Sequence, residues 1–142
     1  MGALAAAVAI GAFASLETLR LGGNWIGDGG MHAFASAVAK GALGNLKELY
    51  LSQNRIGDAG LTSFAEAIGA SGALAQLETL YFQQNEIGEG GMQAFASAVA
   101  SGSLPSLKTL FVDDGPLGTE HTALKEACEA RGIDLPDECW RT

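Results

Sequence analysis

The sequence predicts an α/β solenoid, with a parallel sheet on one side and a row of helices on the other. The first observation is internal repetition, because one unit of sequence occurs four times, and self-similarity at a fixed period is typical of repeat proteins. The units begin at Leu16, Leu46, Leu77 and Leu107, at spacings of 30, 31 and 30 residues. The second observation is a change of period within each unit, from alternating apolar residues to apolar residues three and four apart.

Each unit first predicts a short strand. In the first unit, Leu19 and Leu21 alternate with an exposed residue, which is the pattern of a strand with one buried face. Since a single unit cannot bury its apolar face alone, neighbouring units must stack and pair their strands. Four parallel strands are therefore expected at residues 18–21, 48–51, 79–82 and 109–112.

Each unit then predicts a helix. In the first unit, Met31, Phe34 and Val38 lie three and four residues apart, as on one face of a helix. Asp28 and Asp58 stand where a helix begins, and their side chains can accept hydrogen bonds from its free N–H groups. Glycines that can adopt a left-handed conformation are placed at the helix ends, at Gly41, Gly72 and Gly102. The second unit is one residue longer in its last helical turn.

The N-terminal run AVAIGAFAS allows two interpretations. It imitates the apolar core of a secretory signal peptide, but no positively charged residue precedes it. Shifted by 30 residues, residues 3–16 align instead with residues 33–46, which are the helical half of a repeat. We therefore expect a leading helix near residues 3–10.

A single domain is expected over residues 1–142, because a chain of this length can bury one core. Its expected parts are a half repeat at 1–15, repeats at 16–45, 46–76 and 77–106, and a C-terminal repeat with its cap at 107–142. In the cap, Leu124 and Cys128 keep an apolar inner face, while charged residues cover the remainder, as a terminal repeat requires. Ile133 and Leu135 alternate around Asp134 and predict a short fifth strand.

Composition excludes several classes of partner. The formal charge is −8, from 16 acidic and 8 basic residues, so the protein would repel nucleic acid. The chain is too polar between its apolar runs to span a membrane. Its two cysteines, Cys128 and Cys139, fit neither a disulfide scaffold nor a metal cluster, and free thiols in the cytoplasm are expected.

The repeated motif LxxLxLxxNxIGDxG occurs as LETLRLGGNWIGDGG and LKELYLSQNRIGDAG, and slightly altered as LETLYFQQNEIGEGG. It resembles the leucine-rich repeat of the ribonuclease-inhibitor-like class over nearly the whole chain. The resemblance implies a curved horseshoe with the sheet on the concave side, the helices on the convex side, and a buried ladder of Asn24, Asn54 and Asn85. Asn supplies both donor and acceptor to backbone groups that burial would leave unpaired. The fourth copy has Gly115 in the Asn position, so the solenoid should end there.

No motif in the chain predicts catalysis, a metal site or a cofactor. The loop GGNWIGDGG lies between a strand and a helix, where N–H groups can hold a phosphate, but no Lys-Ser/Thr pair follows it. An acidic residue also stands at the helix start, where it would occupy the site that a phosphate needs. His32 and His121 have no acidic or thiol partner at ligand spacing, and no base is placed to activate a serine or threonine. We therefore expect no enzyme.

The candidate binding residues lie on the strand face that should point away from the helices. One column of that face places three aromatic side chains on neighbouring strands, about 4.8 Å apart. With the loop residues beside it, the candidate surface is Arg20, Trp25, Tyr50, Arg55, Tyr81 and Phe111. Trp, Tyr and Arg often carry the binding energy of interfaces, although stacked aromatics can also simply support a sheet. A second column, Glu17, Lys47, Glu78 and Lys108, alternates in charge and is interpreted as a structural ladder.

Two functions are predicted. The first is a non-enzymatic scaffold that binds a protein partner on its concave face, as the resemblance implies. The alternative is a regulatory GTPase-activating protein similar to Ran GTPase activators, which have a similar repeat type and acidity, although no residue here matches a motif special to them. The N-terminal edge strand is expected to self-associate, or to be covered by an upstream repeat, because unpaired strand edges pair with other chains.

Overall fold

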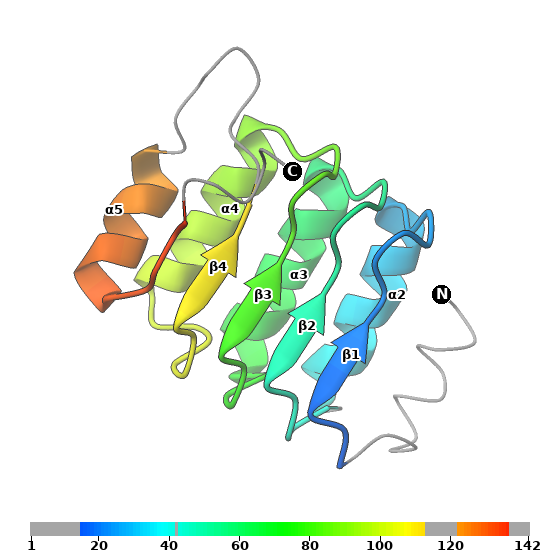
Figure 1. Cartoon of the computed structure of the whole chain (residues 1–142), viewed down its shortest axis with the longest axis horizontal. Helices are drawn as coiled ribbons and strands as arrows, with labels where there is room; N and C mark the ends of the chain where they lie inside the picture. The colour runs from blue at the N-terminus through cyan, green and yellow to red at the C-terminus, as the bar shows by residue number, and fades with distance from the viewer. Residues whose placement is uncertain (1–14, 42, 113–121, 137–142) are drawn as a thin grey trace.

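The computed structural model describes residues 15–41, 43–112 and 122–136, and in them strands alternate with helices (Figure 1). The elements in chain order are β1 (Thr18–Arg20), α2 (Asp28–Ala39), β2 (Glu48–Tyr50), α3 (Asp58–Ser71), β3 (Thr79–Tyr81), α4 (Glu89–Ala100), β4 (Thr109–Phe111) and α5 (Thr122–Arg131). The expected leading helix near 3–10 lies outside the described residues.

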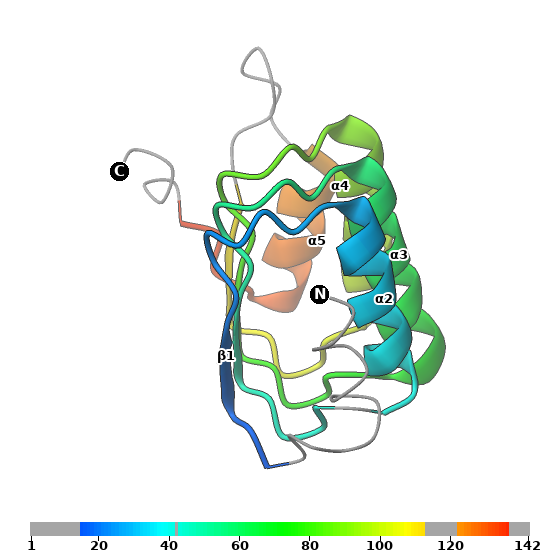
Figure 2. The same cartoon turned by 90° about the vertical axis from the view of Figure 1, so that its right-hand side faces the viewer.

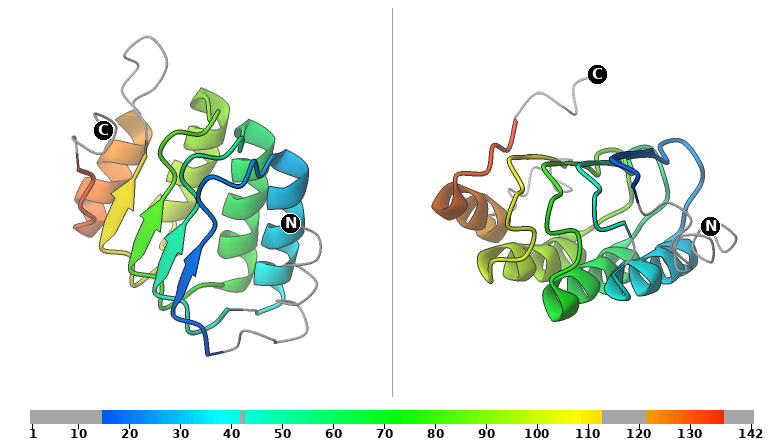
Figure 3. Two further views of the ribbon diagram at one scale, coloured as in Figure 1. Left: turned by 45° about the vertical axis from the view of Figure 1, so that its right-hand side comes forward. Right: turned by 90° about the horizontal axis from the view of Figure 1, so that it is seen from below.

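The four strands form one parallel sheet in the order β1-β2-β3-β4, and the helices form a second layer against one of its faces (Figures 1 and 2). The view from below in Figure 3 shows the two layers edge-on. The expected α/β repeat solenoid is therefore confirmed. We call the face of the sheet that points away from the helices the open face.

Each strand ends one residue before its expected end. The pairing nevertheless continues past the boundary, because Leu21 N donates to Tyr50 O at 2.8 Å and Leu51 N donates to Tyr81 O at 2.8 Å. The sheet hydrogen bonds therefore reach Leu21 and Leu51, the residues at which these strands were expected to end.

The core lies between the sheet and the helices. Leu49, Leu80 and Leu110 occupy one position in successive strands and are fully buried. Each of the helices α2, α3 and α4 contributes a fully buried phenylalanine from one repeat position, at Phe34, Phe64 and Phe95. The two periods in the sequence therefore meet in one apolar layer, which is the main source of stability in such a fold.

The helix ends depend on glycine, as expected. Gly72 ends α3 in the left-handed conformation at φ 64°, and Gly41 and Gly102 follow α2 and α4 with φ 91° and 96°. The second repeat also has the longest helix of the first three, because α3 has 14 residues whereas α2 and α4 have 12 each.

The helix starts are different from the expectation. Asp28 and Asp58 do not cap their own helices, whose cap positions are glycines without a side-chain hydrogen bond. Instead, Asp28 Oδ1 accepts from Gly57 N at 2.7 Å and from Gly60 N at 2.9 Å, at the start of the next helix. The prediction was wrong because each carboxylate points across the repeat interface, where the neighbouring helix presents its free N–H groups.

Asp58 repeats this arrangement one unit later. Its Oδ1 accepts from Gly88 N at 2.7 Å and from Gly91 N at 2.9 Å, at the start of α4. A Cβ at Gly91 would lie 2.8 Å from that oxygen, so the glycine permits the close approach. The IGDxG part of the motif is therefore a capping device between repeats.

The C-terminal cap covers the last repeat. Leu124, Ala127 and Cys128 are buried on the inner face of α5, as expected, and Arg131 donates from Nη1 to Val99 O and from Nη2 to Leu104 O at the end of α4. The expected fifth strand is reduced to a single parallel bridge between Thr109 and Asp134.

Cys128 is a free, buried thiol, and burial raises its pKa to about 11. Cys139 lies outside the described residues. Within the described part of the chain, no helix is long and apolar enough to cross a membrane.

Candidate protein-binding surface

The strand register builds a continuous stack of side chains on the open face. Arg20 pairs with Tyr50, Tyr50 with Tyr81, and Tyr81 with Phe111. The Tyr50 and Tyr81 rings are stacked with centroids 4.1 Å apart and an interplanar angle of 10°, and the Tyr81 and Phe111 rings with centroids 4.4 Å apart at 4°. The Arg20 guanidinium lies 4.9 Å from the centroid of the Tyr50 ring, so it continues the stack at the β1 end.

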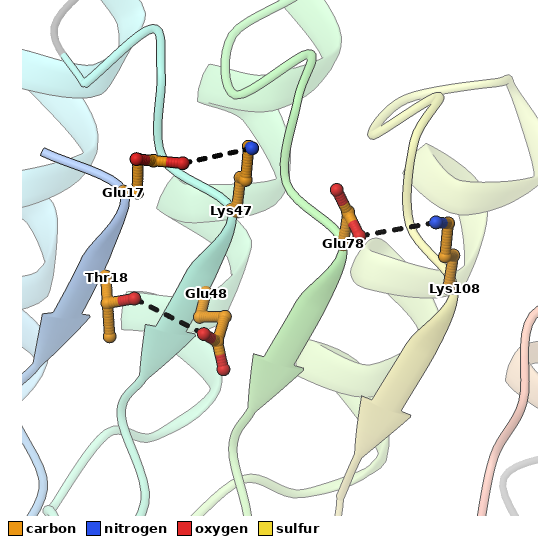
Figure 4. A network of polar contacts seen from close by, with 6 residues as sticks. All are labelled: Glu17, Thr18, Lys47, Glu48, Glu78 and Lys108. Atoms are coloured by element: carbon orange, nitrogen blue, oxygen red, sulfur yellow. Dashed lines mark hydrogen bonds and ion pairs between the residues drawn. The ribbon is translucent and has the colours of Figure 1, made fainter. Parts of the chain in front are cut away.

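A hydrogen-bond network holds the tyrosine end of this stack. Tyr50 OH donates to Glu48 Oε2 at 2.9 Å, and Thr18 Oγ1 donates to Glu48 Oε1 at 3.3 Å. Figure 4 shows the second of these bonds between neighbouring strands. A hydroxyl hydrogen bond with Tyr81, partial burial and the Glu48 carboxylate together raise the pKa of Tyr50 to about 12.

Trp25 and Arg55 form a second contact, in the loops that follow β1 and β2. Trp25 is 71% exposed, and the Arg55 guanidinium lies 4.0 Å from the centroid of its ring. Trp25 also has a positive φ of 57°, which is unusual for a bulky residue. This conformation is maintained by Asn54, whose Oδ1 accepts from the backbone N–H groups on both sides of the tryptophan, at Asn24 and Ile26, each at 2.9 Å.

The asparagines of the expected ladder have different surroundings. Asn54 is buried and bridges two repeats, since its Nδ2 donates to Leu21 O at 2.9 Å and to Leu51 O at 3.2 Å. Asn85 is half-buried and acts similarly, accepting from Ile56 N at 3.0 Å and donating to Leu51 O at 2.8 Å. Asn24 departs from the expected burial, because its side chain is exposed and donates only within its own loop, to Gly22 O.

The column of alternating charge forms two separate ion pairs. Lys47 Nζ lies 3.0 Å from Glu17 Oε1, and Lys108 Nζ lies 3.3 Å from Glu78 Oε1 (Figure 4). The hydrogen bond and charge of Glu17 raise the pKa of Lys47, but the pair is exposed and contributes little stability. The close contacts of this column thus join β1 with β2 and β3 with β4, and the charge of Glu78 also acts on Lys47 between the two pairs.

Sequence reasoning missed two features of the surface. The first is Glu48, the acidic residue in a column that otherwise holds Thr18, Thr79 and Thr109, and this irregularity was the available signal. The second is the positive φ of Trp25, for which a single sequence carries no signal. The described residues contain no group of three or more His, Cys, Asp or Glu arranged to hold a metal.

Comparison with known proteins agrees with this architecture. The family model described as "Leucine Rich repeat" matches residues 14–35 and 45–65. Among solved structures, the chain titled "Leiomodin-1 Actin-Binding Site 2 (ABS2)" superposes with a TM-score of 0.70, at 14% sequence identity, over 94% of this chain and 78% of that chain. No curated protein matches the sequence. These findings support a leucine-rich-repeat protein.

Proposed function

We propose that the protein is a non-enzymatic scaffold that binds a protein partner through the candidate surface, with repeats of the ribonuclease-inhibitor-like class and a cytoplasmic location. The observation that carries the proposal is the exposure of Trp25, a large aromatic side chain that is 71% exposed and lies outside the apolar core. Large exposed aromatic side chains are enriched among the residues that contribute most to binding at protein interfaces.

The stack on the open face supports the same function. Stability requires apolar residues at the inward strand positions, and Leu49, Leu80 and Leu110 already supply them. The outward column could hold small polar residues at little cost, yet it holds Tyr50, Tyr81 and Phe111. Aromatic and arginine side chains are enriched among the residues that dominate binding energy.

The repeat architecture is compatible with this role. The structural neighbour's title names an actin-binding site, and that activity is a property of the neighbour. What the two chains share is a fold that presents an extended surface of neighbouring strands, and such surfaces are used for binding in repeat proteins. The kind of partner that this surface binds must therefore be inferred from its own side chains.

Tyr81→Ala tests the proposal, because Tyr81 is central and contacts a ring on each side. Partners are captured from lysate by wild type, identified, and titrated against both proteins. We expect the affinity to fall about 30-fold, since truncation of a central aromatic typically costs about 2 kcal/mol of binding. Gln93→Ala, at an exposed position of α4 in the helix layer, is the matched control and should leave the affinity unchanged.

The stability of Tyr81→Ala must be measured beside its affinity, because stacked rings also support a sheet. If the melting temperature falls while the affinity of the folded protein stays constant, the stack is structural and the binding proposal is wrong. The GTPase-activating alternative stays a prediction, and no described residue favours it. A GTP hydrolysis assay with a panel of small GTPases would detect it as an accelerated rate.

A further inference from the structure

The charged groups of the open face and of the loop after β2 differ in whether another polar side chain of the protein already pairs with them. Lys47 and Lys108 are paired with carboxylates of neighbouring strands. Glu48 accepts hydrogen bonds from two hydroxyl groups. Arg20 and Arg55, in contrast, contact aromatic rings and have no carboxylate partner among the described residues. Two guanidinium groups therefore remain available to a ligand, in a chain of net charge −8.

The stacked rings present partial positive charge, of the same sign as the two guanidinium groups. Tyr81 is stacked between Tyr50 and Phe111, and Tyr50 lies between Arg20 and Tyr81, so these two rings present their edges rather than their faces to a ligand. The edge of an aromatic ring carries partial positive charge, whereas its face carries negative charge. A ligand on the open face therefore meets ring edges together with the Arg20 guanidinium at the end of the stack.

Arg55 is held in place for such a contact. Its guanidinium lies over the Trp25 ring, 4.0 Å from the ring centroid, and no hydrogen bond occupies its N–H donors among the described residues. Asn54 fixes the strained turn of Trp25, so the platform belongs to the folded backbone. A planar guanidinium that is already oriented loses less entropy when it forms a bidentate pair with a carboxylate.

We propose that the partner presents an acidic peptide segment whose carboxylates pair with Arg20 and Arg55, with an apolar side chain packed beside them. This inference rests on the proposed function and names the chemistry of its partner. Trp25 follows Arg20 by five residues, which limits the distance along the chain to about 17 Å. The two arginine sites are thus within reach of one short extended peptide.

The surface also determines which part of the segment lies over which repeat. Glu86 occupies the loop position of Trp25 and Arg55 in the third repeat, and it would repel a carboxylate there. The acidic residues of the partner therefore lie over the first and second repeats, and its uncharged part lies over Tyr81 and Phe111. A strand of nucleic acid, which carries charge along its entire length, fits this arrangement less well.

The test is a random 12-residue peptide library displayed on phage and selected on the full chain. Only clones whose capture is lost with Tyr81→Ala are sequenced, so that all of them report on the open face. We expect these clones to be enriched in Asp and Glu. Synthetic peptides from them should bind about 5- to 10-fold more weakly to Arg20→Gln and to Arg55→Gln, and more weakly to wild type at higher salt.

Lys40→Gln is the matched control, because it removes the same charge from the end of α2 in the helix layer and should change the affinity less than about 2-fold. Glu86→Gln should strengthen binding. Melting curves of each variant verify that it is folded.

The outcomes separate the two proposals. If no clone depends on Tyr81, both the proposed function and this inference fail. If Tyr81-dependent clones show no acidic enrichment, or if the arginine variants bind them as wild type does, the partner chemistry proposed here is wrong while the proposed function stands. If an oligothymidylate of twelve nucleotides displaces the peptides, the surface is a nucleic-acid site and the inference is overturned.

Discussion

The first and second repeats carry the same pattern of residues, yet their surroundings differ. Leu49 in β2 is fully buried, whereas Leu19, its register partner in β1, is only partly buried. Asn54 is 7% exposed and bridges two repeats, whereas Asn24 is exposed and bonds only within its own loop. The difference teaches that a residue in this fold acquires its role from the neighbouring repeat, as expected where stability resides in the interfaces between units.

The helix caps follow the same rule. The start of α3 depends on Asp28 of the preceding repeat, and the start of α4 depends on Asp58. Removal of one repeat would therefore expose both an apolar face and the free N–H groups of the next helix.

The largest expected effect is that of Asn54→Leu. Its amide serves Asn24 N, Ile26 N and Leu21 O across the repeat interface, so leucine leaves several groups unpaired. We expect the free energy of unfolding in urea to fall by about 3 kcal/mol. Asn24→Leu should cost less than about 1 kcal/mol, because that side chain is exposed. Equal losses for the two variants would show that position in the solenoid does not determine the role of the asparagine.

A smaller effect is expected for Asp58→Ala. Loss of the carboxylate leaves Gly88 N and Gly91 N without their acceptor, and helix caps of this kind contribute about 1–2 kcal/mol. Asp58→Asn keeps a side-chain oxygen as acceptor, so its free energy of unfolding should fall by less than that of Asp58→Ala. Urea unfolding measures both. If Asp58→Ala were as stable as wild type, the contact between repeats would have no energetic value.

The edge of β1 should produce weak self-association. β1 is the end strand of the sheet and, among the described residues, pairs only with β2. An uncovered strand edge can pair with another chain, so the apparent mass in light scattering should rise with protein concentration. Thr18→Lys places a charge on this edge and should reduce the rise. A mass that stays constant for wild type at high concentration would contradict the prediction.

The smallest effect concerns pH. The pKa of Tyr50 is raised to about 12 in the folded protein, from about 10 in an unfolded chain. The folded state therefore holds the phenolic proton more tightly, and this contribution to stability is present below pH 10 and lost as the pH rises toward 12.

Ultraviolet titration of tyrosinate measures the shift. In wild type one tyrosine should ionise late, and in Tyr50→Phe, which leaves Tyr81 as the remaining tyrosine of the chain, the late transition should disappear. A late transition that persists in Tyr50→Phe would assign the raised pKa to Tyr81 instead.

Much of this protein follows from the sequence by itself. The order of strands and helices, their register, the buried leucines and the column Arg20, Tyr50, Tyr81, Phe111 were predicted because periods of two and of 3.6 residues are local properties. The binding role of that column, the domain boundaries and the self-association stay predictions.

The tertiary structure alone decided how these parts are joined. The caps by Asp28 and Asp58, the exposure of Asn24, and the fixation of Trp25 by Asn54 all depend on contacts between residues about one repeat apart in the chain. A sequence shows which groups need partners, since each free N–H or buried amide must be satisfied. Which repeat supplies the partner depends on how the units stack, and that geometry exists only in the folded solenoid.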